Sequence, residues 1–205
     1  MSAAGRSEGR VEHDNYPTPS WCVERLLEAV PLPGGNWLEP AAGDGAIIHA
    51  VSRLREDIRW QAIEIRPECR NWLQQTGAGI AIGDARKVRW DKRVQRVIIT
   101  NPPYSLAEDF LAKALQSSAI IVLLLRLDFL GSERRAPIFR RAAPDVYVLP
   151  NRPSFVRGRT DANEYGWFVW EEDRRAVGRV RVLASTPREI RCPAIGRRRE
   201  PLLLS

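Results

Sequence analysis

The chain has 205 residues, 44% of them hydrophobic and 28% charged, which is typical of one soluble domain with at most a small appendage. Its net charge of +7 favours a polyanionic partner, although an arginine-rich proteome also produces basic proteins. Two histidines and three widely separated cysteines lack the spacing of a metal site or a disulfide framework, so we expect no metal and free thiols.

The amino-terminal segment, residues 1–15, is polar and lacks hydrophobic periodicity, so we expect it to be disordered. It contains no apolar stretch like that of a signal peptide. The longest apolar run, residues 119–125, is too short to span a bilayer and is typical of a buried strand. Together with the unpaired cysteines, these features favour a cytoplasmic protein.

Two prolines precede the first predicted helix, in the sequence Tyr16-Pro17-Thr18-Pro19. Apolar residues then recur at helical spacing over residues 20–30, and Ser20 is a candidate N-cap.

A turn of small residues, Ala41-Ala42-Gly43-Asp44-Gly45, separates a predicted strand at residues 37–39 from a helical pattern. Such a turn lets a ligand approach backbone N–H groups and the amino end of the helix. It is not the dinucleotide-binding GxGxxG pattern. Glu39 and Asp44 would repel a pyrophosphate and suit a cationic cofactor. The alternative is a purely structural strand-to-helix turn.

Two further acidic residues lie at the ends of predicted strands. Glu64 belongs to the strand over residues 60–65, where an acid is placed to hold a ribose diol. Asp84 follows the strand over residues 78–82 and could accept a hydrogen bond from an adenine amino group. A solvent-exposed glutamate and a turn-stabilising aspartate are the structural alternatives.

The sequence Asn101-Pro102-Pro103-Tyr104 follows an apolar, β-branched run at residues 97–99, which predicts a buried parallel strand. The prolines end the strand, so the motif is displayed at the sheet edge where α/β proteins bind ligands. The Asn101 side-chain oxygen and the Pro102 carbonyl can accept both N–H groups of a planar amino group, which favours a more nucleophilic nitrogen. Tyr104 offers a face on which a planar substrate can stack. The alternative is a proline-rich turn with a buried tyrosine.

The second half of the chain continues to alternate helices and strands. We expect a helix at residues 106–115, a strand at 119–125, a helix capped by Ser132 and a strand at 146–149. Residues 165–170 and 177–183 have strong strand patterns around a charged turn, and we expect them to pair as a hairpin. The order predicts an α/β fold with a mostly parallel sheet and an antiparallel C-terminal hairpin.

Taken together, these motifs resemble the class I S-adenosylmethionine-dependent methyltransferases, and among them the enzymes that methylate adenine N6 in DNA. The matching residues are Glu39-Pro40-Ala41-Ala42-Gly43-Asp44-Gly45, Glu64, Gly83-Asp84 and Asn101-Pro102-Pro103-Tyr104. A cofactor loop that precedes the NPPY motif is like the order of the γ class. The resemblance covers roughly residues 16–170 and implies a Rossmann-like fold. We therefore divide the chain into a disordered segment (1–15), a methyltransferase domain (16–186) and a basic tail (187–205).

The resemblance implies S-adenosylmethionine as the cofactor and a role for each matching residue. No metal is needed, because the sulfonium already makes the methyl group electrophilic. The residues expected near the methionine part are Pro17, Thr18, Glu39, Ala41, Gly43, Asp44 and Gly45. Glu64 would bind the ribose hydroxyls, and Asp84 the adenine amino group of the cofactor.

On the substrate side, the resemblance implies that Asn101 and Pro102 hold the target amino group, next to Pro103, and that Tyr104 stacks on the target base. We expect Phe155 to cover the opposite face of that base, with Trp167 as a weaker rival and a core position as the alternative for both.

Double-stranded DNA is the favoured partner, with the target base flipped out of the helix. The loop at residues 151–163 carries Arg152, Arg157 and Arg159, which suit phosphate contacts. DNA-specific relatives commonly carry a sizeable target-recognition domain, whereas here only the loop at residues 151–163 and the basic tail are available for this role, so we expect short or relaxed sequence specificity. The motif also occurs in relatives that methylate RNA adenine or protein glutamine, which are alternative substrates. A non-catalytic nucleic-acid-binding module is the third hypothesis.

Overall fold

The fold was obtained as a computed structural model, in which residues 17–90, 94–155, 162–171 and 178–191 are described. The strands are β1 (Gly35–Glu39), β2 (Ile58–Glu64), β3 (Gly79–Ile82), β4 (Val97–Thr100), β5 (Ile120–Arg126), β6 (Asp145–Val148), β7 (Tyr165–Trp170) and β8 (Val180–Val182). The helices are α1 (Ser20–Ala29), α2 (Ala46–Ser52), α3 (Arg70–Gln74), α4 (Ala107–Ala114), α5 (Ala136–Arg141) and α6 (Arg188–Arg191), with 3-10 turns η1 (Pro67–Cys69), η2 (Tyr104–Leu106) and η3 (Leu127–Leu130).

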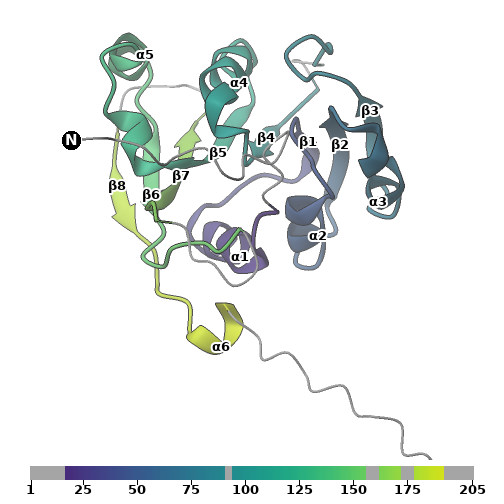
Figure 1. The fold of residues 1–205 in the computed structure, drawn as a ribbon, viewed down its shortest axis with the longest axis horizontal. Coiled ribbons are helices and arrows are strands. Elements are labelled where there is room, and N and C mark those ends of the chain that lie inside the picture. The colour runs from purple at the N-terminus through teal and green to yellow at the C-terminus, as the bar shows by residue number, and fades with distance from the viewer. Residues whose placement is uncertain (1–16, 91–93, 156–161, 172–177, 192–205) are drawn as a thin grey trace, which may run out of the picture.

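The strands of the described residues form one sheet in the order β3-β2-β1-β4-β5-β7-β6-β8 (Figure 1). The pairs from β3 through β5 are all parallel, whereas β7 is antiparallel to both of its neighbours. The expected α/β class with a mostly parallel sheet is confirmed. Between β1 and β4 the direction of strand succession reverses, and ligands bind at such switch points, outside the carboxyl ends of the strands.

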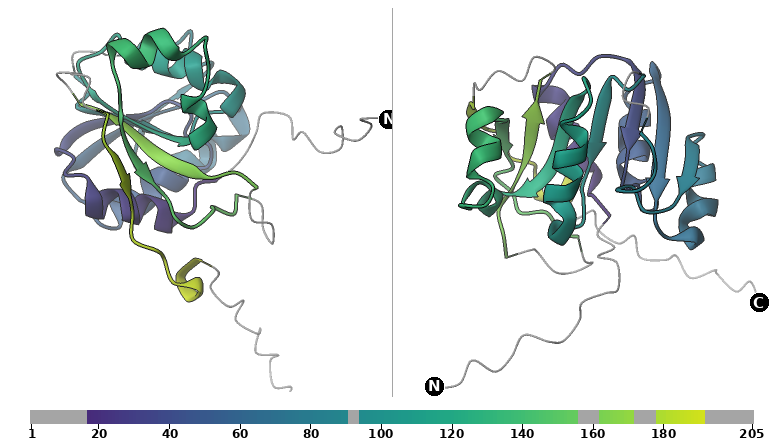
Figure 2. Two further views of the ribbon diagram at one scale, coloured as in Figure 1. Left: turned by 90° about the vertical axis from the view of Figure 1, so that its left-hand side faces the viewer. Right: turned by 90° about the horizontal axis from the view of Figure 1, so that it is seen from above.

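Helices cover both faces of the sheet, as Figure 2 shows. The first three helices pack on one face and share its core with residues such as Val97 and Ile99, while α4 and α5 cover the other face with Ile98. Because successive strand residues point to opposite faces, a strand buried on both sides must be apolar throughout. This explains why the continuous apolar run that becomes β4 signals a central strand.

Two predicted caps do not occur as expected. Ser20 is the first residue of α1, and its cap is Pro19, whose carbonyl accepts a 3.0 Å hydrogen bond from the Cys22 backbone N–H. The φ of −58° and ψ of 136° at Pro19 place it just outside the helix. Ser132 lies in a turn before α5, which begins at Ala136.

The expected pairing of residues 165–170 with 177–183 is wrong. All six residues of β7 are buried, and β5 and β6 occupy its two edges, so neither edge can accept β8. The three exposed residues of β8 instead extend the sheet by pairing in parallel with β6. Strand propensity is therefore right for both segments, and only their partners differ.

The ends of the chain are partly outside the described residues. The segment 1–15, predicted to be disordered, lies outside the described residues, and within the predicted tail the residues of α6 are helical. Cys22 and Cys69 are buried free thiols, as predicted, while Cys192 lies outside the described residues. Among the described helices, none has the length and apolar character needed to cross a membrane.

Candidate active site

A pocket lies at the carboxyl ends of β1 to β4, at the switch point of the sheet. Ten of the predicted site residues line it: Pro17, Thr18, Glu39, Ala41, Gly43, Asp44, Glu64, Asp84, Asn101 and Pro103. They come from four strand ends and from the segment before α1, so they are brought together only by the tertiary fold.

The loop after β1 owes its shape to glycines with positive φ. Gly43 has a φ of 60° and Gly45 a φ of 85°, a region that other residues rarely adopt. A Cβ at Gly45 would also lie only 2.9 Å from Cγ2 of Thr76. Asp44 Oδ1 accepts a 3.2 Å hydrogen bond from the Ala46 backbone N–H at the start of α2. Gly45 is the N-cap of α2 and is outside the pocket lining, and its expected contact with a cofactor stays a prediction.

Glu64 ties the loop after β1 to the end of β2. Its Oε2 accepts a 2.6 Å hydrogen bond from the Gly43 backbone N–H. Its Oε1 accepts hydrogen bonds from the Arg66 backbone N–H at 3.0 Å and from Arg66 Nε at 2.8 Å. The carboxylate is therefore buried, ion-paired and held at the pocket wall, where it also shapes the loop.

Glu39 is the most deeply buried acid of the pocket, with 2% of its surface exposed. Its Oε2 has no hydrogen-bond partner among the described residues. Burial, reinforced by the nearby charge of Asp44, raises the pKa of Glu39 well above its ordinary value, against the lowering effect of the Ile48 backbone N–H. A cationic ligand would remove this penalty by pairing with the carboxylate.

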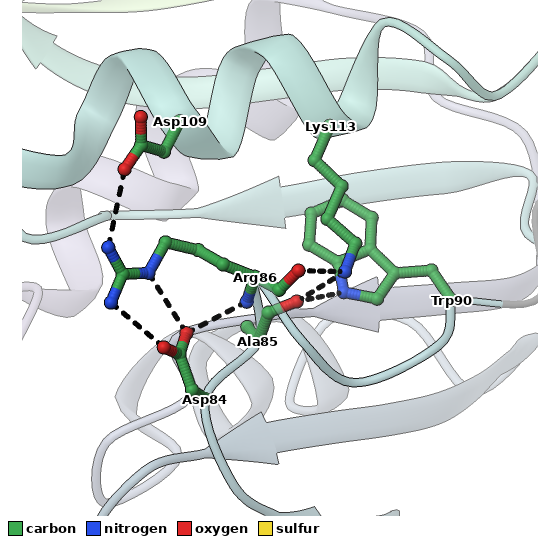
Figure 3. A network of polar contacts seen from close by, with 6 residues as sticks. All are labelled: Asp84, Ala85, Arg86, Trp90, Asp109 and Lys113. Carbon is green, nitrogen blue, oxygen red and sulfur yellow. Dashed lines mark hydrogen bonds and ion pairs between the residues drawn. The ribbon is translucent and has the colours of Figure 1, made fainter.

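Asp84 is held in an ionic network that joins the loop after β3 to α4 (Figure 3). The Arg86 guanidinium donates to Asp84 at 3.0 and 2.8 Å and reaches Asp109 on α4 at 3.3 Å. The hydrogen bonds from Arg86 lower the pKa of Asp84, so this carboxylate stays ionised at the pocket wall.

The side chain of Lys113, on α4, binds backbone carbonyl groups of the same loop. Its Nζ donates hydrogen bonds to the carbonyls of Ala85 (2.7 Å), Arg86 (2.8 Å) and Val88 (2.6 Å). The ammonium also lies 5.1 Å from the centroid of the buried Trp90 ring (Figure 3). Charge-assisted hydrogen bonds are stronger than neutral ones, so this contact fixes the loop that carries Asp84.

The motif after β4 faces the pocket through Asn101. Asn101 Nδ2 donates a 3.2 Å hydrogen bond to the hydroxyl oxygen of Thr18, and both residues line the pocket. Pro102 is buried and outside the pocket lining, and Pro103 lines the pocket. The Pro103 carbonyl accepts a 2.8 Å hydrogen bond from the Leu106 backbone N–H, which closes η2.

Tyr104 lies beyond the pocket lining, with 39% of its surface exposed, which rules out the alternative of a buried tyrosine. Its hydroxyl donates to Asp128 Oδ1, and the Arg126 guanidinium lies over its ring. Partial burial and the bond to Asp128 raise the pKa of Tyr104 above its ordinary value, so the hydroxyl stays protonated.

Neither a protein-family model nor a curated protein sequence matches the chain. Solved structures do match. A Listeria monocytogenes protein assigned to the class I S-adenosylmethionine-dependent methyltransferases aligns over 84% of this chain and 67% of its own, at a TM-score of 0.57 and 11% identity. A dimethyladenosine transferase from Plasmodium falciparum aligns over 73% of this chain and 59% of its own (TM-score 0.55, 13% identity).

A third match is the modification subunit assigned to a type I restriction enzyme of Vibrio vulnificus, with a TM-score of 0.55 and 15% identity. The alignment covers 82% of this chain and 46% of the subunit, so the chain spans about half its length. The 205-residue chain described here therefore has the Rossmann-like class I methyltransferase fold. Identities this low show the fold alone.

Within this methyltransferase fold, the predicted second stacking ring does not lie at the pocket. Phe155 is 9% exposed and packs edge-on against Tyr165 in the core, with ring centroids 5.0 Å apart. Trp167 is fully buried and donates its Nε1 proton to the Cys22 carbonyl at 2.8 Å. Both positions match the core alternative, because aromatic side chains contribute most stability where they are fully buried.

The predicted phosphate-contacting arginines are only partly described. Arg152 is half exposed and forms an ion pair with Glu164. Arg157 and Arg159 lie outside the described residues.

The sequence motifs do not reveal several residues at or beside the candidate site: Arg66, Arg86, Lys113, Arg126 and Asp128. Arg66 and Arg86 follow their acidic partners by two residues, a local signal that could have been read. Lys113 had no such signal, because its partners lie 25 to 28 positions away. Within the described ranges, no three His, Cys, Asp or Glu side chains gather so as to hold a metal ion.

Proposed function

We propose that the protein transfers a methyl group from S-adenosylmethionine to the exocyclic N6 of adenine in DNA, with short or relaxed sequence specificity. One observation carries this proposal: Asn101 shares a pocket at the switch point of the sheet with Glu39, Glu64 and Asp84. The acids could hold a cationic nucleoside, and the amide could hold the group that it modifies.

The acidic pocket fits this cofactor. Oε2 of the buried Glu39 has no hydrogen-bond partner among the described residues, so it suits the ammonium and sulfonium charges of S-adenosylmethionine. This agrees with the expectation that an acidic loop favours a cationic cofactor over a pyrophosphate. Gly43 keeps a side chain out of the loop, and Glu64 and Asp84 provide carboxylate oxygens for the ribose and the adenine amino group. When bound, the cofactor supplies an electrophilic methyl group.

The chain's own residues would then align and activate the target nitrogen. Asn101 Oδ1 and the Pro102 carbonyl would accept the two N–H groups of the target amine, an interaction that strengthens as the nitrogen becomes tetrahedral. The nitrogen that Asn101 and Pro102 hold would accept the methyl group and would release its surplus proton to solvent. The exposed Tyr104 would stack on the flipped base.

DNA is favoured over other substrates by the charge of the chain and by the motif order of the γ class. Arg152, together with Arg157 and Arg159, would contact phosphates. RNA adenine is the second candidate, because a dimethyladenosine transferase is among the structural neighbours. Protein glutamine is a third. A non-catalytic module is disfavoured because Asn101 and the acidic wall are all present at one pocket.

The test is incubation with isotopically labelled S-adenosylmethionine and DNA, RNA or protein, followed by mass spectrometry of each. The proposal requires labelled N6-methyladenine in DNA, and much less of it when the Asn101→Ala variant replaces the wild type for the same time. Label only in RNA or protein would replace the substrate and retain the chemistry. Folded wild-type protein that binds no cofactor by calorimetry would refute the assignment.

A further inference from the structure

The side-chain amide of Asn101 has a partner 83 positions away in the chain. Its Nδ2 donates a 3.2 Å hydrogen bond to Thr18 Oγ1. Thr18 is 6% exposed, so little water competes for this contact. The resemblance to methyltransferases places Thr18 near the methionine of the cofactor, whereas the structure places its hydroxyl on the residue that would hold the target amine.

Thr18 is held rigidly because a proline lies on either side of it. Prolines have a fixed φ, which limits the backbone on both sides of the threonine. Pro19 caps α1, and α1 is anchored through buried residues such as Trp21 and Leu26. The backbone that carries the hydroxyl is therefore anchored to the core through α1.

An asparagine amide needs such a partner to present one particular atom. Its terminal torsion has two nearly equivalent orientations that exchange the oxygen and the nitrogen. In the productive orientation Oδ1 faces the N–H groups of the substrate. In the reversed orientation Nδ2 would face them, donor against donor. The hydrogen bond that the structure shows, from Nδ2 to Thr18 Oγ1, belongs to the productive orientation, and a methyl group in the place of the hydroxyl could not accept it.

We propose that Thr18 is a positioning residue that holds the Asn101 amide with its oxygen toward the target amine. This inference rests on the proposed methyl transfer. It differs from a cofactor-binding role in what it predicts: loss of the hydroxyl slows the chemical step and leaves cofactor affinity unchanged.

The experiment compares Thr18→Val, which removes the hydroxyl, with Thr18→Ser, which keeps it. Single-turnover methylation of an adenine-containing DNA duplex gives the rate of the chemical step, and calorimetry with S-adenosylhomocysteine gives cofactor affinity. Thr18→Val should be about 10-fold slower, the effect of about 1.4 kcal/mol, with affinity within about twofold of wild type. Thr18→Ser should recover most of the rate.

Thr100→Val is the matched control. Thr100 is fully buried next to the motif, and its hydroxyl has no hydrogen-bond partner among the described residues. Thr100→Val replaces a hydroxyl by a methyl group just as Thr18→Val does, but it should leave the methylation rate unchanged. Thermal denaturation of each variant verifies that it is folded.

A double-mutant cycle gives the decisive result. If Thr18 acts through Asn101, then Thr18→Val has no further effect on the rate in an Asn101→Ala background. Additive rate effects would overturn the inference, as would weaker S-adenosylhomocysteine binding with an unchanged saturated rate. If the wild type methylates no substrate, the proposed function falls first. If the wild type is active and Thr18→Val is equally fast, only this inference falls.

Discussion

The hydroxyl of Tyr104 donates a 2.7 Å hydrogen bond to Oδ1 of Asp128. On one face of the ring, the Arg126 guanidinium lies 4.2 Å from the ring centroid. These two contacts hold the Tyr104 ring in place, while 39% of the surface of the residue remains exposed.

We therefore expect the ring of Tyr104 to matter more than its hydroxyl. Tyr104→Ala should lower kcat/KM for DNA by about 10–100-fold, because stacking on a base contributes about 1–3 kcal/mol. Tyr104→Phe should lose about tenfold at most, since an exposed hydrogen bond contributes about 0.5–1.5 kcal/mol. Steady-state kinetics of both variants on one duplex measures this difference. Equal losses would assign the effect to the bond with Asp128.

Asn101 should separate chemistry from cofactor binding. Asn101→Ala should lower the rate of methyl transfer by about 10²–10³-fold, the usual effect of removing one transition-state hydrogen bond. S-adenosylhomocysteine should bind the variant as it binds the wild type, because in the proposed mechanism the amide would face the target amine and not the cofactor. Single-turnover rates and calorimetry on the same preparation test both statements. An unchanged rate would remove Asn101 from the mechanism.

Glu64 should be required for cofactor affinity. Glu64→Ala removes an acceptor for the ribose and also releases the Gly43 backbone N–H. Each charge-assisted hydrogen bond is worth about 1.5–3 kcal/mol, so calorimetry should show at least a tenfold rise in the Kd of S-adenosylhomocysteine. Glu68→Ala is the control, because Glu68 is an exposed acid outside the pocket lining. Similar affinities in the two variants would contradict the assigned role.

Glu39 should make the protein without cofactor less stable as the pH rises. The pKa of Glu39 in the folded protein is raised by burial, so the unfolded chain releases this proton first. The folded state then binds more protons than the unfolded state, and the free energy of unfolding falls as pH rises above about 4.3, by at most about 1.4 kcal/mol per pH unit. The decline ends once the pH passes the raised pKa.

Glu39→Gln should remove this contribution to the decline, because glutamine does not titrate. Urea unfolding of wild type and variant at pH 5, 6, 7 and 8, without cofactor, gives the difference in slope. The variant should also bind S-adenosylhomocysteine more weakly, since it lacks the negative charge. Parallel stability curves would show that Glu39 does not bind a proton on folding.

DNA binding should depend steeply on salt and weakly on sequence. Reading a base pair takes groove contacts worth about 1–3 kcal/mol each, which need a dedicated surface. The loop at residues 151–163 instead offers arginines such as Arg152, which suit phosphates. Fluorescence anisotropy at several salt concentrations, and sequencing of methylated random DNA, test this. Methylation confined to one long site would refute relaxed specificity and leave the adenine chemistry in place.

The strands and turns of this protein could be predicted from the sequence because their causes are local. The apolar run before Asn101 is buried on both faces, so it needs no alternation, and the prolines after it end the strand. The positive φ of Gly43 and Gly45 explains the turn that separates β1 from α2. The position of the pocket followed from the same reasoning, since parallel strands place their carboxyl ends at one edge.

Only the tertiary structure decided which segments meet. The insertion of β7 between β5 and β6, the contact of Thr18 with Asn101, and the burial of Phe155 each join parts far apart in the chain. Such contacts depend on which of the alternative packing arrangements of whole elements has the lowest free energy, and a local sequence pattern does not indicate which one that is. The residue types at the pocket were therefore readable from the sequence, whereas their partners were set by packing.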